Sequence, residues 1–252
     1  MRPALIITHL EDRHTGLVRE CLERAGCPVR ELNPLDQALA PFVDELSGIV
    51  SLGGRVSATH ADHDPFLAAE VALIAAALDR RVPVLGMCLG AQLLAVAAGG
   101  RVTAMERMYV GWPELELLSA AAEDPVFGGL GSGLPVLEWH EDMIELPTGA
   151  TVLGATPGPG AALFRVGSAA WGSQMHLELT PPMLLDGWLV KPGDVAEIEA
   201  AGHGIDAFRA LCARRLQAQM AAARPVFSRF AGIVLASERD RAPDDLRSAL
   251  RD

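Results

Sequence analysis

One cysteine lies where its side chain could act as a nucleophile. Cys88 follows the apolar run Val84 to Met87 and precedes a helical pattern, in the arrangement Gly-x-Cys-x-Gly. A sharp turn from a buried strand into a helix strains the backbone at the nucleophile, so its neighbours must be small. The start of the helix favours a thiolate, and the N–H of Leu89 is placed to bind a developing oxyanion. We therefore predict that Cys88 attacks a carbonyl carbon.

The alternative is that Cys88 is a buried structural residue, which is the commonest role of cysteine. The flanking glycines and the strand–helix junction weaken that interpretation for Cys88. Cys21, Cys27 and Cys212 have no such setting, and we interpret them as core residues. Four irregularly spaced cysteines do not make a disulfide framework in a chain of this length. We expect a reducing, cytoplasmic setting.

A thiolate nucleophile needs a general acid or base, and that group needs an orienting partner. His176 and Glu178 lie two residues apart at the end of the apolar stretch 170–175. In an extended chain both side chains leave the same face, so the carboxylate can hold the imidazole in one tautomer. His-x-Glu alone is a weak signal, because exposed His and Glu are common. Combined with Cys88, it predicts a Cys-His-Glu triad for acyl transfer.

The elements that must position these groups alternate between apolar strands and helices in the first part of the chain. This pattern indicates a parallel sheet covered on both faces. From residue 101 to 175, strand-like runs separated by turns predict an antiparallel extension of that sheet. The expected strands are 4–8, 28–32, 48–52, 81–87, 115–118, 136–139, 151–155, 162–166 and 170–175, and the expected helices are 15–25, 66–78 and 89–98.

Helical patterns return after Pro182, and we expect residues 191–252 to form a helical extension packed on the domain of residues 1–190. A long helix is predicted to begin near Ile205. Its apolar stripe from Phe208 to Met220 is interpreted as core rather than as a docking surface. Pro225 is predicted to kink or end this helix, and the charged tail after Ser237 to be loosely held.

Composition excludes several classes of function. The chain has 252 residues, half of them hydrophobic, and a formal net charge of -11. This charge argues against nucleic acid and against an anionic membrane surface as partners, since both attract clustered Lys and Arg. The N-terminal apolar run is too short for a signal peptide, and the other runs are too short or too charged to span a membrane.

Four segments together resemble the class I, or triad, glutamine amidotransferases. Two of them resemble the segments that carry the family's nucleophile and its histidine and glutamate. The others resemble its glycine-rich oxyanion strand and the segment before the histidine strand. Their order and spacing match from about Ala4 to Trp188. The segments are PVLGMCLGAQLLA at 83–95, WGSQMHLE at 171–178, SLGGRVSA at 51–58 and WHEDMIELPTGATVLGAT at 139–156.

The resemblance implies a flavodoxin-like α/β sandwich that hydrolyses glutamine to glutamate and ammonia without a metal or an organic cofactor. Carried over by position, Cys88, His176 and Glu178 are the nucleophile, the acid/base and its orienting group. The N–H groups of Gly54 and Leu89 would form the oxyanion hole. Gln92 would help to hold the bound glutamine. The likeness is greatest to guanosine monophosphate synthetase-type amidotransferase domains and their free-standing relatives.

The sequence departs from the family pattern in three respects. Arg55 and Leu177 stand where many members have proline, and neither change removes a reacting group. No synthetase domain follows within these 252 residues. The resemblance therefore leaves open a separate synthetase chain as partner, and also a homo-oligomer.

Three other groups of polar residues carry alternatives. The stretch from His60 to Asp64 crowds ligand-type residues together, and it is interpreted as a polar rim loop rather than a metal site. His140 and Asp142 are assigned a rim or structural role by default. Glu70 interrupts an apolar helix, where it would meet a substrate or a partner, or be the one solvated position.

Three functions stay open at this point. The first is a glutaminase that supplies ammonia to a separate synthetase. The second is a self-sufficient hydrolase of γ-glutamyl amines or peptides, with Arg55 and the loop from His60 shaping the leaving-group pocket. The third is a non-enzymatic binding protein that keeps the fold, and the intact triad set argues against it because a scaffold does not need all three groups.

Overall fold

A computed structural model of the chain describes residues 1–36, 39 and 42–249. At its centre five parallel strands form one half of a nine-stranded sheet, in the order β2-β1-β3-β4-β11. The predicted parallel sheet is confirmed. These strands are β1 (Ala4–His9), β2 (Val29–Leu32), β3 (Gly48–Gly54), β4 (Val84–Met87) and β11 (Ala170–Ser173).

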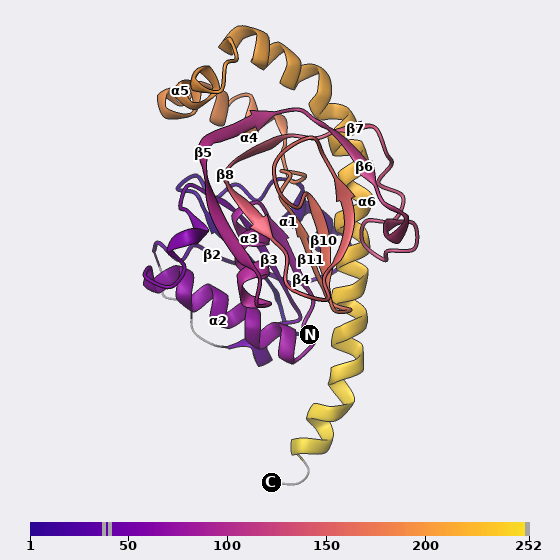
Figure 1. The fold of residues 1–252 in the computed structure, drawn as a ribbon. Helices are drawn as coiled ribbons and strands as arrows, with labels where there is room; N and C mark the ends of the chain where they lie inside the picture. The colour runs from indigo at the N-terminus through magenta and orange to yellow at the C-terminus, as the bar shows by residue number, and fades with distance from the viewer. Residues whose placement is uncertain (37–38, 40–41, 250–252) are drawn as a thin grey trace.

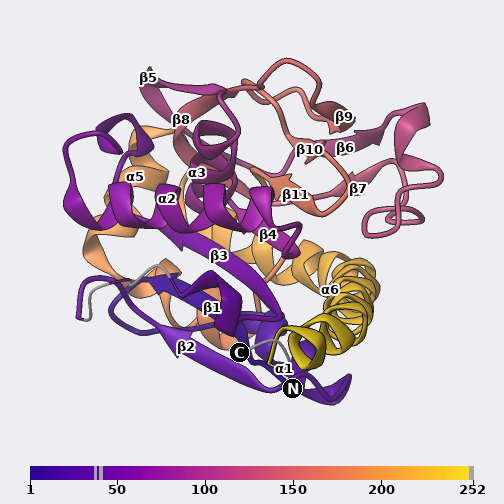
Figure 2. The ribbon, with the colours of Figure 1, turned by 90° about the horizontal axis from the view of Figure 1, so that it is seen from below.

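Helices cover both faces of this parallel half (Figure 1, Figure 2). Because side chains alternate along a strand, Ala4 and Ile6 of β1 join the core on one face, while Leu5 and Ile7 join the core on the other. The first core contains residues of α1 and α6, and the second contains residues of α2 and α3. The helices are α1 (Gly16–Arg24), α2 (Pro65–Asp79), α3 (Leu89–Ala97) and α6 (Ile205–Ala249).

The second half of the sheet is antiparallel, as predicted, and continues the order as β11-β10-β9-β6-β7. Two strands from the same part of the chain leave this sheet and pair with each other. The expected strand 136–139 is thus only the start of a longer strand outside the main sheet. The additional strands are β5 (Arg101–Gly111), β6 (Glu114–Leu117), β7 (Leu134–Pro135), β8 (Glu138–Glu145), β9 (Thr151–Ala155) and β10 (Leu163–Val166).

The long helix α6 begins at Ile205 as predicted, and it does not end at Pro225, which was one of the two outcomes expected there. The helix continues to Ala249 along one side of the body (yellow in Figure 1). Proline removes one backbone hydrogen bond, yet Val226, Phe227 and Phe230 just beyond it are fully buried against the sheet. Burial of such side chains contributes about 1.5–3 kcal/mol each, which outweighs the lost bond. Phe208 and Leu216 are buried too, which confirms the core interpretation of the stripe.

The charged segment after Ser237 is held at its start, contrary to the expectation of a loose tail. Glu238 accepts a hydrogen bond from the backbone N–H of Arg2, and Arg241 donates to the carbonyl of Leu46. Residues 250–252, at the end of the expected extension, lie outside the described residues. Within the described part of the chain, no helix has the length and apolar character needed to cross a membrane.

Short helices make the remaining connections. Two of them, α4 and α5, come between β11 and α6 in the chain. These short elements are α4 (Pro181–Leu184), α5 (Pro192–Ala200) and the 3-10 turns η1 (Val43–Glu45), η2 (Ala58–His60), η3 (Ser119–Ala121) and η4 (Trp188–Val190).

Candidate active site

Cys88 occupies the junction between β4 and α3. Its backbone has φ 49° and ψ -108°, a conformation that non-glycine residues rarely adopt. The backbone N–H of Cys88 donates to the carbonyl of Ser173 at 2.7 Å, which ties the junction to the end of β11. The predicted sharp strand-to-helix turn is therefore present, and Cys88 carries its strain.

The two glycines of the motif are required by close backbone contacts. A Cβ added at Gly86 would collide with the backbone of Gly90, and one added at Gly90 would collide with the backbone carbonyl of Ser51 on β3. The helix α3 can therefore approach the sheet only if both positions lack a side chain. This packing places the start of α3, and with it Cys88, against β3.

The Gly90→Ala variant is expected to lose about 2–3 kcal/mol of unfolding free energy, because the new methyl must displace backbone rather than a flexible side chain. Urea denaturation followed by circular dichroism measures this loss. Gly232→Ala in α6 is the matched control, since a Cβ there meets nothing within 4 Å. The control should gain about 0.5–1 kcal/mol from helix propensity. A Gly90→Ala variant as stable as the wild type would contradict the packing argument.

His176 and Glu178 follow β11 in a turn rather than in the extended chain that the sequence suggested. Their side chains still meet: Nδ1 of His176 lies 2.8 Å from Oε1 of Glu178. Both are buried, with 4% and 1% of their surface exposed. Gln219 of α6 donates to the His176 carbonyl at 2.8 Å, so the long helix also positions this turn.

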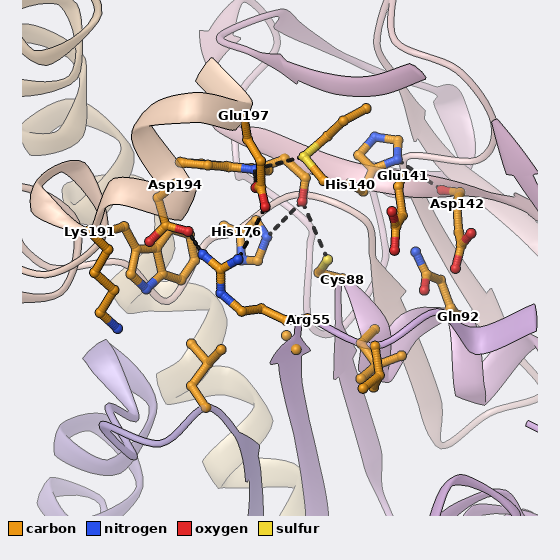
Figure 3. Close-up of a pocket in the computed structure, with 18 residues that line it drawn as sticks. Arg55, Cys88, Gln92, His140, Glu141, Asp142, His176, Lys191, Asp194 and Glu197 are labelled. Carbon is orange, nitrogen blue, oxygen red and sulfur yellow. Dashed lines mark hydrogen bonds and ion pairs between the residues drawn. The ribbon is translucent and has the colours of Figure 1, made fainter. Parts of the chain in front are cut away.

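The side chains of Cys88 and His176 converge on one point, the carbonyl oxygen of Trp139 (Figure 3). The Cys88 sulfur lies 3.7 Å from this oxygen and Nε2 of His176 lies 3.4 Å from it. A Cβ added at Gly53 would lie 3.5 Å from Cβ of Cys88 and 2.8 Å from Cε1 of His176. The two predicted reacting groups are therefore neighbours, although 88 residues separate them in sequence.

The electrostatic setting favours a protonated His176. Burial alone would lower the pKa of His176, but the negative charges of Cys88 and Glu178 and their hydrogen bonds outweigh it. The pKa of His176 is raised well above 6.5 as a result. A protonated His176 beside the Cys88 sulfur can later give its proton to a leaving group.

Cys88 and His176 line an open pocket of about 800 Å³. The predicted residues Gly54, Leu89 and Gln92 line it, together with Cys88 and His176. The amide of Gln92 donates from Nε2 to Oε1 of Gln174 at 3.3 Å, which fixes its orientation. The pocket sits at the carboxyl ends of β3, β4 and β11, where ligands of parallel sheets usually bind.

The pocket has two sides, one on each side of Cys88 (Figure 3). On one side lie Gln92, Glu141 and Asp142. Asp142 accepts from Ser57 Oγ and from the Ala58 N–H through Oδ2, while its buried Oδ1 has no hydrogen-bond partner among the residues that the structure describes. Partial burial raises the pKa of Glu141, and the carboxylates of Asp142 and Glu197 raise it further. This side of the pocket is therefore acidic and carries a free acceptor.

A sequence model of the family described as glutamine amidotransferase class-I matches residues 10–183 of the chain. This chain belongs to the class I glutamine amidotransferase family. The crystal structure of a glutamine amidotransferase from Thermotoga maritima superposes with a TM-score of 0.78 at 25% identity, covering 91% of this chain and 98% of that one. A glutamine amidotransferase from Methylobacillus flagellatus gives 0.78 at 26% identity, covering 92% of this chain and 95% of that one.

Two curated relatives of this chain are matched over only part of their own length. The glutamine amidotransferase-like protein YfeJ of Salmonella typhimurium is 35% identical over 57% of this chain and 62% of its own length. The glutamine-hydrolysing GMP synthase of Aeropyrum pernix is 29% identical over 77% of this chain and 38% of its own length. The chain thus spans less than two thirds of each of these relatives. The resemblance inferred from the four motifs is confirmed, as is the flavodoxin-like fold.

On the other side of Cys88, the pocket is lined by Arg55 and by three residues that the sequence did not single out, Trp188, Asp194 and Glu197. The Trp188 ring packs edge-on against His176, with 5.0 Å between ring centroids. Arg55 forms ion pairs with Asp194 and with Glu197, and Glu197 also accepts from Trp139 Nε1 at 2.9 Å. Trp188 and both acidic residues follow the segment that the family model matches, so no motif identified them.

The other candidates are placed as follows. The loop from His60 to Asp64 is not among the residues that line the pocket. Among the side chains that the structure describes, those of residues 1–36, 39 and 42–241, no three His, Cys, Asp or Glu residues are grouped to hold a metal ion. His140 and Asp142 both line the pocket. Both expectations for Glu70 are wrong: it is fully buried and binds His9 and Ser51, because α2 turns this position toward the sheet.

Proposed function

We propose that this amidotransferase hydrolyses the γ-amide of glutamine to glutamate and ammonia through a thioester on Cys88. The observation that carries the proposal is the convergence of the strained Cys88 and the Glu178-bound His176 in one pocket. Membership of the family adds support, because it agrees with the chemistry of the site. We propose no metal or organic cofactor, since every step below uses side chains and backbone groups of this chain.

In the first half of the reaction, the Cys88 thiolate attacks the side-chain carbonyl carbon of glutamine. The N–H groups of Gly54 and Leu89 hold the negative oxygen of the tetrahedral intermediate. The carbon–nitrogen bond then breaks, and His176 gives its proton to the departing nitrogen, so that ammonia leaves and a γ-glutamyl thioester remains. Glu178 keeps the His176 ring in the orientation that this transfer needs.

In the second half, the now neutral His176 takes a proton from a water molecule as that water attacks the thioester carbon. The same two N–H groups hold the second oxyanion. The carbon–sulfur bond breaks, glutamate leaves, and the Cys88 thiolate and the His176 imidazolium are restored. Atoms and charge balance over the cycle, because one water is consumed and one amide bond is cleaved.

The acidic side of the pocket suits the amino-acid end of the substrate. We propose that the α-ammonium of glutamine binds the unpartnered Oδ1 of Asp142, with Glu141 nearby, and that Gln92 contacts the substrate from the same side. A buried carboxylate oxygen without a donor is costly, and a bound ammonium would supply that donor. The γ-amide then reaches Cys88, and its nitrogen points toward His176 and the covered side of the pocket.

The fate of the ammonia is a separate part of the proposal. Relatives such as the Aeropyrum pernix GMP synthase are named as glutamine-hydrolysing synthases, and this chain matches 38% of that protein. We propose that a separate synthetase uses the ammonia, in the cytoplasm. We also propose that residues 191–252 form one unit with residues 1–190, because Gln219 of α6 contacts the backbone of both His176 and Leu137.

A second candidate function is favoured by the cover on the leaving-group side. Trp188, Asp194 and Glu197 belong to this same chain and line the pocket, and the Trp188 ring packs against His176. A site in which residues of the same chain enclose the leaving group could cleave an N-substituted γ-glutamyl amide without any partner. In that case Arg55 and its two carboxylate partners would contact the amine portion of the substrate.

A substrate panel distinguishes the two functions. Purified protein is offered glutamine, γ-glutamyl alkylamines and γ-glutamyl peptides, and release of ammonia or amine is followed. The first function predicts that glutamine has the highest kcat/KM, with no N-substituted amide above about one tenth of it. The second predicts that an N-substituted amide exceeds glutamine. Hydrolysis of none of these compounds would contradict both.

A further inference from the structure

A second buried histidine–glutamate pair lies behind the oxyanion strand and takes no part in the proposed chemistry. Nε2 of His9, at the end of β1, lies 2.7 Å from Oε2 of Glu70 on α2. Ser51 of β3 donates from Oγ to the other oxygen of Glu70 at 2.6 Å. The exposed fractions are 5% for His9 and 0% for both Glu70 and Ser51.

The partners of His9 determine its protonation. Nδ1 of His9 faces the carbonyl oxygen of Leu52 at 3.1 Å, and Nε2 faces a carboxylate oxygen of Glu70. The Leu52 carbonyl can only accept, so Nδ1 donates to it, and the raised pKa of His9 favours a second proton on Nε2, which then donates to Glu70. Burial lowers the pKa of His9, but the charge of Glu70 and hydrogen bonds to Glu70, Gly53 and Leu52 outweigh it and raise the pKa.

Stability alone does not account for such a pair. A buried ion pair costs desolvation, and apolar residues of similar size often serve stability equally well or better. The location of the pair is more informative. The pairing of β1 with β3 shifts register between Ile7 and His9, which brings His9 opposite Gly54. A Cβ added at Gly54 would lie only 2.6 Å from Cβ of His9.

The peptide bond explains what this contact can do. The carbonyl of Gly53 and the N–H of Gly54 belong to one planar trans peptide and point in opposite directions. Nδ1 of His9 donates to the carbonyl of Leu52 on one side of this peptide, and a Cβ at Gly54 on its other side would lie 2.6 Å from Cβ of His9. Gly53 and Gly54 line the pocket, whereas His9 does not line it. A side chain that is bonded to Leu52 and packed on Gly54 limits the rotation of the peptide plane between Gly53 and Gly54, and thereby fixes the direction of the Gly54 N–H.

We propose that His9, held by Glu70, is a positioning residue that fixes the Gly53–Gly54 peptide plane so that the Gly54 N–H points at the oxyanion. The proposal rests on the proposed function for the identity of that oxyanion. It assigns Glu70 and Ser51 a supporting role, since they hold the imidazolium against the strand. His9 touches neither the substrate nor the reacting atoms.

Two substitutions of His9 separate positioning from stability. An asparagine places an amide near the position of Nδ1 and keeps a donor for the backbone carbonyl, whereas a glutamine reaches toward Glu70 and loses that donor. His9→Gln should therefore be the more stable variant, because Glu70 keeps a partner. His9→Asn should be the more active one. Activity and stability are expected to rank the two variants in opposite orders.

Kinetics provides the first readout. For His9→Gln we expect kcat for the γ-glutamyl substrate to fall about 100-fold, the scale of losing one oxyanion donor, with KM within about threefold of wild type. Alkylation of Cys88 by iodoacetamide should stay within about threefold, because displacement at a saturated carbon forms no oxyanion. His9→Asn should retain most of kcat. His14→Gln, at an exposed position, is the matched control and should behave as wild type.

The amide resonance of Gly54 provides a second readout that needs no substrate. In protein labelled with nitrogen-15 glycine, this resonance should move in His9→Gln and stay near its wild-type position in His9→Asn and in His14→Gln. If the wild type cleaves no γ-glutamyl amide while Gly54 follows this order, the proposed function fails and the positioning role stands. If the wild type is active and Gly54 does not respond to His9→Gln, the positioning role is overturned.

Two further results would overturn the proposal. One is that kcat ranks the two variants in the same order as stability does, with His9→Gln at least as active as His9→Asn. The other is a parallel loss of kcat and of iodoacetamide reactivity, which would indicate general disorder of the site. Should His9→Asn not fold, Glu70→Gln replaces it. Its amide can donate to Nε2 and leave the Nδ1 proton facing Leu52, so it should keep most of kcat while His9→Gln does not.

Discussion

Replacement of Cys88 by alanine should lower kcat for glutamine hydrolysis by at least about 10⁴-fold, because no other group in the pocket can form the thioester. The binding of glutamine should change little, since its amino-acid end is proposed to bind Asp142 and Gln92 and not Cys88. Ammonia release measures kcat, and calorimetric titration with glutamine measures affinity. Cys212→Ala is the matched control. Its sulfur is buried and accepts from Trp112 Nε1 at 3.2 Å, away from the pocket residues.

Position 88 also tests the backbone strain at the turn between β4 and α3. A non-glycine residue at φ 49° stores about 1–3 kcal/mol, which a glycine would release. Cys88→Gly should therefore be as inactive as Cys88→Ala and yet not less stable than it. Equal activity of wild type and Cys88→Ala would contradict the role of Cys88, whatever the stabilities are.

Glu178→Gln should lower kcat by about 10²–10⁴-fold with the fold preserved. The amide cannot stabilise an imidazolium as a carboxylate does, and its NH₂ can select the wrong tautomer of His176. KM should change much less than kcat, since Glu178 lies behind His176 and does not line the pocket. Glu199→Gln, at an exposed position on α5, is the control and should retain wild-type kinetics.

The pH dependence of stability follows from the same interaction. Burial lowers the pKa of His176, but the charges of Cys88 and Glu178 and the hydrogen bonds to them outweigh it, so that the pKa is raised above 6.5. A raised pKa contributes stability that is full below pH 6.5 and is lost as the pH rises through the folded-state pKa. The wild type should thus lose unfolding free energy above pH 6.5 more steeply than Glu178→Gln. Urea denaturation at several pH values measures both slopes, and a steeper slope for Glu178→Gln would contradict the assignment.

Local chemistry explains which parts of the site could be predicted from sequence. The sharp strand-to-helix turn at Cys88 is encoded within a few residues, because a strained turn between two apolar elements needs glycines at fixed offsets. The His176–Glu178 pair was also identified, although its geometry is a turn and not a strand. That Cys88 and His176 meet depends on the parallel register of β4 with β11, which aligns Met87 with Ser173. No local pattern encodes that register, and the family resemblance supplied it.

The residues that were missed act over long distances in the chain. Glu70 looked like a stray charge on an apolar helix, since its partners His9 and Ser51 come from other strands. The helix continues past Pro225 because the aromatic residues beyond it are buried, and this burial is a tertiary effect that the local sequence does not encode. Trp188 and the two acidic residues of α5 belong to a segment without any recognisable motif. Their role follows only from where the fold places them.

The most direct test is to mix the protein with an activated substrate such as γ-glutamyl p-nitroanilide, stop the reaction in acid, and determine the mass of the intact chain. An activated leaving group makes cleavage of the carbon–nitrogen bond fast, so the intermediate accumulates. We expect a mass increase of one γ-glutamyl group, located on the peptide that contains Cys88 and absent in Cys88→Ala. Release of nitroaniline over many turnovers by a chain whose Cys88 is never modified would contradict the account.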